Sequence, residues 1–130
     1  MTEHPNAELA RRGYAAFSSG DMNTLRDLIA EDAIWHQPGQ TAIAGDYIGR
    51  DRIFEYFGKL FELSGGTFKA DPEHIFADDD RAVVIQHTTG AREGKTLDLH
   101  LVLVFEIRGG KFAETQVYSP DQQKDDAFWS

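Results

Sequence analysis

The spacing of apolar residues changes once along this chain, and that change limits the folds it can adopt. Up to about residue 64, apolar residues recur at intervals of three and four, which is the period of helices packed on a core. From Phe68 onward the interval falls to two, the period of strands with one buried face. Helices followed by strands predict an α+β domain in which helices cover one face of a curved antiparallel sheet. Such a sheet and its cover enclose a cone-shaped pocket.

Local signals divide the first half of the chain into three helices. Asn6 can cap the first helix, and Gly20-Asp21 ends it and caps the second. A third helix is expected from Asp51 to the stop signal Ser64-Gly65-Gly66. Between the second and third helices, residues 33–37 are expected to form a short extended run that ends at Pro38-Gly39. Four strands then follow at residues 68–77, 82–89, 96–107 and 112–118.

The size and composition of the chain indicate one domain that folds without disulfides or structural metal ions. Its 130 residues are 41% hydrophobic and 12% aromatic, so residues 1–130 are expected to form a single domain with a real core. The net charge of −9 argues against a nucleic-acid partner, and the lack of cysteine excludes disulfides and thiol chemistry. No leader or membrane-spanning pattern is found, so a cytoplasmic protein without a membrane partner is expected.

Several strings, in this order and spacing, resemble the SnoaL-like branch of the nuclear transport factor 2-like superfamily. They are Ser19-Gly20-Asp21, Ala30-Glu31-Asp32-Ala33-Ile34-Trp35, Gly45-Asp46-Tyr47-Ile48-Gly49-Arg50 and Gly110-Lys111-Phe112-Ala113-Glu114. The resemblance implies the cone-shaped fold of that superfamily, with three N-terminal helices on a curved antiparallel sheet. It also implies a small, largely apolar ligand, with cofactor-independent isomerase, cyclase, lyase or hydrolase chemistry as one option.

The catalytic residues of two related enzyme families are not matched. Where ketosteroid isomerases have a catalytic base and an acid, the resemblance places Gln37 and Leu103, and the tyrosine position falls one residue before Tyr14. Limonene epoxide hydrolases have charged residues at positions that are similar to His87, Thr89 and Val117.

Candidate site residues follow from this placement and from alternation along the strands. Trp35 and Gln37 share one strand face, which the resemblance turns toward the pocket. His87 follows Val83 and Ile85 at period two and is the best candidate for acid–base catalysis. The expected ligand-binding set is Tyr14, Trp35, Gln37, His87, Thr89, Leu103 and Val117.

The remaining histidines are expected on the outer face of the sheet. His36 alternates away from Trp35, and His100 shares a face with Asp98 and Val102. No two histidines have the helical spacing of a zinc motif, so neither a metal nor a cofactor is expected. The resemblance implies a homodimer formed through this outer face.

Two classes of function remain open at this point. The first is a protein that binds a small apolar metabolite and acts on it weakly or not at all, and the second is a non-enzymatic homodimeric interaction module. The volume of the cavity distinguishes them, because an open pocket of several hundred Å³ favours a ligand and a filled one favours the interaction module.

Overall fold

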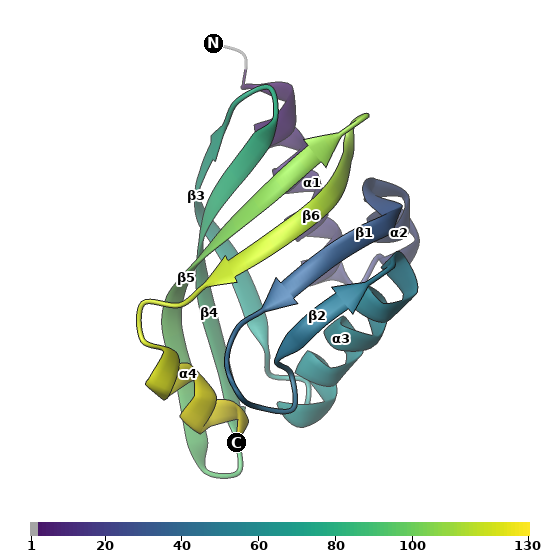
Figure 1. Ribbon diagram of the computed structural model, residues 1–130. Coiled ribbons are helices and arrows are strands. Elements are labelled where there is room, and N and C mark those ends of the chain that lie inside the picture. Colours follow the sequence, from purple (N-terminus) through teal and green to yellow (C-terminus); the bar gives the residue numbers. More distant parts are fainter. Residues whose placement is uncertain (1–2) are drawn as a thin grey trace.

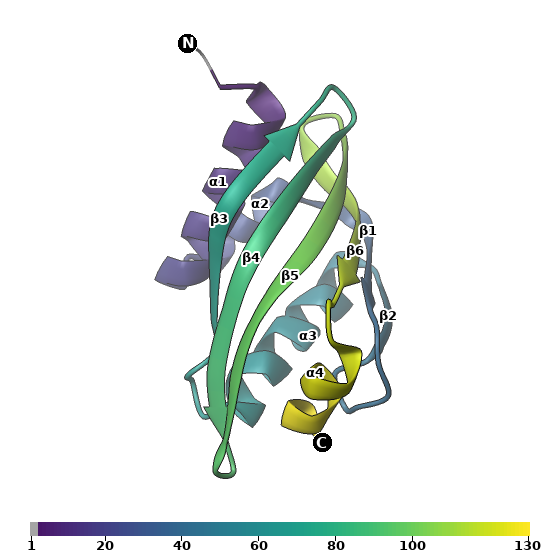
Figure 2. The ribbon, with the colours of Figure 1, turned by 90° about the vertical axis from the view of Figure 1, so that its left-hand side faces the viewer.

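The computed structural model describes residues 3–130 and shows a curved sheet with helices against its concave face (Figures 1 and 2). The helices are α1 (Pro5–Ser19), α2 (Met22–Leu28), α3 (Arg50–Leu63) and α4 (Gln122–Trp129). The strands are β1 (Ile29–Gln37), β2 (Gly45–Ile48), β3 (Lys69–Ala77), β4 (Arg81–Arg92), β5 (Lys95–Arg108) and β6 (Lys111–Tyr118).

The sheet has six strands in the order β2-β1-β6-β5-β4-β3. Strands β3 to β6 form the antiparallel meander expected from the period-two half of the chain. β1 pairs with β6 in parallel, however, so the sheet is mixed and mostly antiparallel. The expected α+β fold is therefore confirmed, with one parallel pair added by β1 and an edge strand, β2, that the sequence pattern did not reveal.

The first two helices follow from their capping residues. The side chain of His4, and not that of Asn6, caps α1, because its Nδ1 accepts a hydrogen bond from the Asn6 backbone N–H at 3.0 Å. Gly20 has φ 74° and ends α1 in the left-handed conformation, which glycine adopts without steric cost. Asp21 then caps α2 by accepting from the Thr24 backbone N–H, as the sequence predicts.

Helix α3 supplies the cover of the sheet's concave face. Ile53, Tyr56, Phe57 and Leu60 are buried on one side of it, at the spacing of three and four that the sequence shows. Burial of each such side chain stabilises the fold by about 1.5–3 kcal/mol. The opposite side of the helix carries charged residues and faces water.

The chain ends in a helix, α4, that docks at one end of the sheet near the β4–β5 hairpin (Figure 1). Phe128 and Trp129 are buried, so this apolar pair packs into the core. Arg92 and Lys95 donate hydrogen bonds to backbone carbonyls of α4, including those of Phe128 at 3.3 Å and Ala127 at 3.0 Å. These two cations bind the C-terminal end of the helix, where its dipole favours positive charge.

The other side of α4 packs against the turn that follows β1. Gly39 has φ 108°, a conformation that favours glycine, and a Cβ atom added there would lie 2.2 Å from Asp126 Oδ1 and displace that side chain. Among residues 3–130, none of the helices is long and apolar enough to cross a membrane.

Candidate ligand cavity

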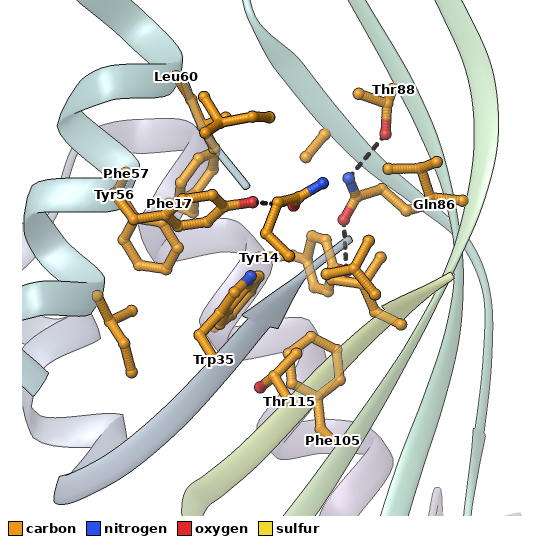
Figure 3. A pocket seen from close by; sticks show the side chains of 18 of the residues that line it. Tyr14, Phe17, Trp35, Tyr56, Phe57, Leu60, Gln86, Thr88, Phe105 and Thr115 are labelled. Atoms are coloured by element: carbon orange, nitrogen blue, oxygen red, sulfur yellow. Dashed lines mark hydrogen bonds between the residues drawn. The ribbon is translucent and has the colours of Figure 1, made fainter. Parts of the chain in front are cut away.

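A cavity of about 80 Å³ lies between the helices and the concave face of the sheet (Figure 3). Most of its wall is apolar, and aromatic rings dominate it. The aromatic lining residues are Tyr14, Phe17, Trp35, Tyr56, Phe57, Phe68, Phe105, Phe112 and Trp129. Trp35 lies at the centre of this cluster, with its ring centroid 5.3 Å from that of Phe57 and 5.5 Å from that of Tyr56. The Trp35–Phe57 contact is edge-to-face and the Trp35–Tyr56 contact is tilted, and such contacts between rings favour fixed orientations.

A chain of hydrogen bonds joins helix α1 to strand β4 at one side of the cavity. The Tyr14 hydroxyl donates to Gln86 Oε1 at 2.7 Å, and Gln86 Nε2 donates to Thr88 Oγ1 at 2.7 Å. All three side chains are buried and line the cavity. Each of these three polar side chains therefore has a hydrogen-bond partner inside the protein, which removes most of the cost of its burial.

A second polar group, on strand β1, is less completely satisfied. The Tyr56 hydroxyl donates to Gln37 Oε1 at 2.5 Å, but Gln37 Nε2 reaches only the backbone oxygen of Pro38 at 3.5 Å. The indole N–H of Trp35 is buried and makes no hydrogen bond of normal geometry among the described residues, although it lies near the Tyr56 hydroxyl and acts to lower the pKa of Tyr56 against the larger effect of burial. Two N–H donors two residues apart on β1 therefore lack good acceptors, a state that costs free energy in a dry site.

Burial keeps both cavity tyrosines neutral. It raises the pKa of Tyr14 and of Tyr56 far above the ordinary range of a phenol. Both hydroxyls thus remain hydrogen-bond donors at any physiological pH, which fixes the direction of the bonds to Gln86 and Gln37.

The titratable carboxyl group of the cavity is Asp125, in α4. Its side chain lines the cavity and the residue is only 2% exposed. Burial, with a smaller contribution from the charge of Asp126, raises the pKa of Asp125 to about 6, although the nearby Trp129 side chain acts in the opposite direction. This carboxyl group can therefore take up or release a proton near neutral pH.

Sequence reasoning missed Asp125 because it lies in an acidic tail. The run Asp121 to Asp126 resembles a solvated segment, since it contains no apolar residue. The available signal was the apolar pair Phe128-Trp129. If this segment is a helix whose two rings are buried, Asp125, one turn earlier, lies on the same buried face.

Five of the seven predicted ligand-binding residues lie along the cavity. They are Tyr14, Trp35, Gln37, Leu103 and Val117. The other two, His87 and Thr89, do not line it, because both are half-buried on the outer face of β4 while Gln86 and Thr88 point inward. The reason is that Ala82 to Ile85 are apolar on both faces of the strand, so alternation alone did not identify the inner face.

The catalytic role predicted for His87 loses its structural basis with this orientation. Its imidazole bonds to Asp98 on the outer face at 2.7 Å, away from the cavity. His36 and His100 lie on that outer face as expected. His36 is held there by two carboxylates, with Nδ1 2.7 Å from Asp46 and Nε2 2.6 Å from Glu114.

Residues 10–115 match the family model of the SnoaL-like domain, and the chain belongs to that family. The fold and the cavity agree with this assignment. An uncharacterised protein of Mycobacterium tuberculosis is 28% identical over 131 residues that cover both chains completely.

Two solved structures of similar sequence have the same fold. Bal32a, from a soil-derived mobile gene cassette, is 46% identical with a TM-score of 0.94, and the match covers 97% of each chain. A protein of unknown function with a cystatin-like fold from Xanthomonas campestris is 33% identical with a TM-score of 0.88, over 95% of this chain and 96% of the other.

Two more distant structures share the fold alone and were crystallised with small molecules. TerC, co-crystallised with polyporic acid, is 22% identical with a TM-score of 0.84, over 96% of this chain and 98% of the other. A protein of Catenulispora acidiphila with a ketosteroid isomerase-like fold, in complex with trimethylamine, is 17% identical with a TM-score of 0.74. The match covers 92% of this chain and 91% of the other.

Proposed function

We propose that the cavity binds a small, largely apolar molecule that carries one hydrogen-bond acceptor. The observation that carries this proposal is the unpaired indole N–H of Trp35 in an aromatic cavity. Figure 3 shows the Trp35 nitrogen on the side of the ring that faces the other lining side chains. A carbonyl or ether oxygen placed there would accept from Trp35, and Gln37 Nε2 is a second donor on the same strand face.

The volume of the cavity sets the size of this ligand. A water molecule needs roughly 10–15 Å³ of such space, so about 80 Å³ holds roughly five to eight water-sized groups. A molecule with one ring fits this space, whereas a polycyclic one does not fit without side-chain movement. The cavity is thus smaller than the several hundred Å³ of drug-sized sites, yet it is not filled.

Asp125 is the group that would act on such a molecule, in place of His87. A carboxyl group with a pKa of about 6 can accept a proton from carbon beside a bound carbonyl and return it at another position. The N–H groups of Trp35 and Gln37 would stabilise the oxygen as it gains negative charge. This arrangement supports a cofactor-independent isomerase, cyclase or lyase. The structures of TerC with polyporic acid and of the Catenulispora protein with trimethylamine support the binding of small molecules by this fold.

A matched pair of probes tests the binding proposal. Cyclohexanone and methylenecyclohexane have nearly the same shape, but only the ketone has an acceptor. Ligand-detected NMR should show that the protein prefers the ketone by roughly two- to tenfold, the value of one net hydrogen bond. The Trp35→Phe variant should lose this preference and still bind both probes. Failure of both probes to bind the wild-type protein would overturn the proposal and favour the interaction module.

We also propose that the chain forms a homodimer through the outer face of the sheet. Val83 lies opposite Val104 there, and Ile85 lies opposite Val102, and all four side chains are only half-buried. A strip of apolar side chains at the centre of an open sheet face, with polar groups around it, resembles the core and rim of an interface.

A further inference from the structure

Three neighbouring strands bring two histidines and a glutamate together on the outer face, away from the cavity. His87 of β4 lies directly opposite His100 of β5 in the strand register. Their imidazole rings are stacked, with centroids 4.6 Å apart and planes within 8° of each other. Glu73 of β3 approaches both rings from the adjacent strand. The sequence has no pair of histidines at the spacing of a helical zinc motif. Here the pairing of neighbouring strands brings the three residues together instead.

Glu73 owes its position to an irregularity in the edge strand. The pairing of β3 with β4 shifts between Pro72, opposite Gln86, and His74, opposite Ile85. Glu73 is therefore the extra residue of a β-bulge, a feature that redirects a side chain and bends the strand. Bulges recur beside binding and catalytic sites for this reason.

The ligand atoms of the three residues lie near one another. Glu73 Oε1 lies 3.0 Å from His100 Nε2, and Glu73 Oε2 lies 4.0 Å from His87 Nδ1. One ligand atom from each residue can be chosen so that all lie within 4.8 Å of one another. Ligand atoms about 2.0–2.1 Å from a tetrahedral zinc ion lie about 3.3–3.4 Å apart, so the side chains must move closer by up to about 1.5 Å. The two stacked imidazole rings must also turn out of their parallel arrangement, so that both nitrogens point at one ion.

Asp98 prepares His87 for a metal. It bonds to His87 Nε2 at 2.7 Å, which leaves Nδ1 directed toward Glu73. A carboxylate on the far nitrogen of a ligating histidine fixes the ring orientation and raises its basicity, as in many zinc sites. His36 lacks this arrangement, because carboxylates engage both of its nitrogens.

We propose that Glu73, His87 and His100 bind one Zn²⁺ ion through a carboxylate oxygen and two imidazole nitrogens, with Asp98 as the outer partner of His87. Two histidines and one glutamate form a ligand set that zinc prefers, and three protein ligands leave a fourth position for water. In the single chain the site is half-exposed on rigid strands, so zinc can reach it from solvent without unfolding. It lies on the same sheet face as the apolar strip of the proposed dimer, directly beside Ile85 and Val102, so in that dimer it would lie at the edge of the interface. It is independent of the cavity and of its proposed ligand.

The proposal is tested by titration of the full chain, free of any histidine tag and treated with chelator, with Zn²⁺ in a calorimeter. One equivalent per chain should bind, and binding should disappear in His100→Gln and in Glu73→Gln. Asp98→Asn should weaken binding by roughly tenfold, the effect of losing an outer carboxylate. Circular dichroism should show that all three exposed substitutions leave the fold intact.

Two matched variants show where any zinc binds. His74→Gln alters the other residue of the bulge, and His36→Gln removes the histidine between Asp46 and Glu114; both should bind zinc as the wild type does. Titration with Co²⁺ should give the visible absorption of a four-coordinate nitrogen and oxygen site. The proposal is overturned if the wild type shows no saturable binding, or if His100→Gln binds as tightly as the wild type.

Discussion

At the scale of single residues, the folded structure disfavours a charged side chain most clearly at Asp125. Its carboxyl group is buried among aromatic side chains, so the charged form loses most of its hydration. The folded state therefore favours the protonated form, which is why the pKa rises from 3.8 to about 6. A group of this kind lowers the stability of the protein at neutral pH and is expected where function requires it.

Replacement of Asp125 by asparagine should remove this conflict. Because the folded pKa lies above the unfolded one, the carboxyl group stabilises the fold fully below pH 3.8, and this contribution is lost as pH rises through about 6. The unfolding free energy of Asp125→Asn should therefore equal that of the wild type near pH 4. At pH 8 it should be higher than that of the wild type, by at most about 3 kcal/mol.

Urea unfolding of both proteins at pH 4, 6 and 8 measures this difference. The exposed Asp27→Asn substitution in α2 is the control for the loss of one negative charge. A gain in Asp125→Asn that stays constant with pH would show that the carboxyl group is not held in the protonated form by burial.

Tyr56 should stabilise the fold through its bond to Gln37. Tyr56→Phe keeps the ring but leaves Gln37 Oε1 buried without its donor, so a loss of about 1–3 kcal/mol is expected in urea unfolding. Tyr118→Phe removes the same atom from a residue that is 54% exposed and should change stability by less than about 0.5 kcal/mol. Equal losses in the two variants would contradict a buried hydrogen bond.

The sequence could predict some residues of the cavity and not others. Trp35 and Gln37 are two apart and so share a strand face, and the family resemblance turned that face toward the pocket, where both side chains lie. On β4 the polar residues Gln86 and His87 are adjacent, and either could have been the inner one. The hydroxyl of Tyr14, 72 residues away, decides the matter by giving Gln86 a buried partner, and no local pattern contains that information.

At the scale of elements, α4 depends on contacts that lie outside it. Four of its eight residues are glutamine or aspartate at 122, 123, 125 and 126, and its polar start gave no helical signal. The helix forms because Phe128 and Trp129 are buried and because Arg92 and Lys95 bind its last carbonyls. Strand β2 was missed for a similar reason, since its four residues depend on pairing with β1.

Arg92→Ala should loosen α4 without unfolding the sheet. The substitution removes donors to the carbonyls of Phe128 and Ser130, while Lys95 keeps one of these contacts. Hydrogen exchange of the α4 amides should become roughly tenfold faster, which corresponds to about 1.4 kcal/mol, and exchange in β5 should not change. Arg108→Ala, at the other end of the sheet, is the control; equal exchange of α4 in wild type and Arg92→Ala would contradict the role of this side chain.

His36 should connect three strands in a pH-dependent manner. Its bonds to Asp46 on β2 and Glu114 on β6 raise its pKa, with the bond to Asp46 as the largest cause. Since the folded pKa is raised, the stabilisation is fully present below the ordinary value of 6.5 and is lost as pH rises through the folded pKa.

His36→Gln should therefore cost stability mainly at low pH. A loss of about 0.5–1 kcal/mol is expected at pH 5.5, because the pair is partly exposed and screened by solvent, and less is expected at pH 9. Thermal unfolding at the two pH values measures it. A larger loss at pH 9 than at pH 5.5 would contradict a protonated imidazole between two carboxylates.

At the scale of the whole molecule, the fold was predictable because its signal is spread along the chain. The change of period near residue 66, the turn strings and the order of elements all agree, so an error in one strand face did not alter the topology. The cavity was not predictable in the same way. Its volume is the small difference between the space the sheet encloses and the volume of the side chains that enter it, and packing sets that difference.

The proposed dimer makes a prediction about the molecule as a unit. Ile85→Glu places a carboxylate at the centre of the apolar strip formed with Val83, Val102 and Val104. The side chain reaches water in the monomer, so the fold should persist, but burial in an interface would cost several kcal/mol and weaken the dimer by roughly a hundredfold or more.

Sedimentation over a range of protein concentrations should show a wild-type dimer and an Ile85→Glu monomer. Ile48→Glu makes the same chemical change at an edge position that is 67% exposed, and it should leave the dimer intact. Because each chain carries a net charge of −9, added salt should strengthen the association by screening the repulsion between two chains. A wild type that sediments as a monomer at every concentration and salt level would mean that the apolar strip does not hold two copies of this chain together.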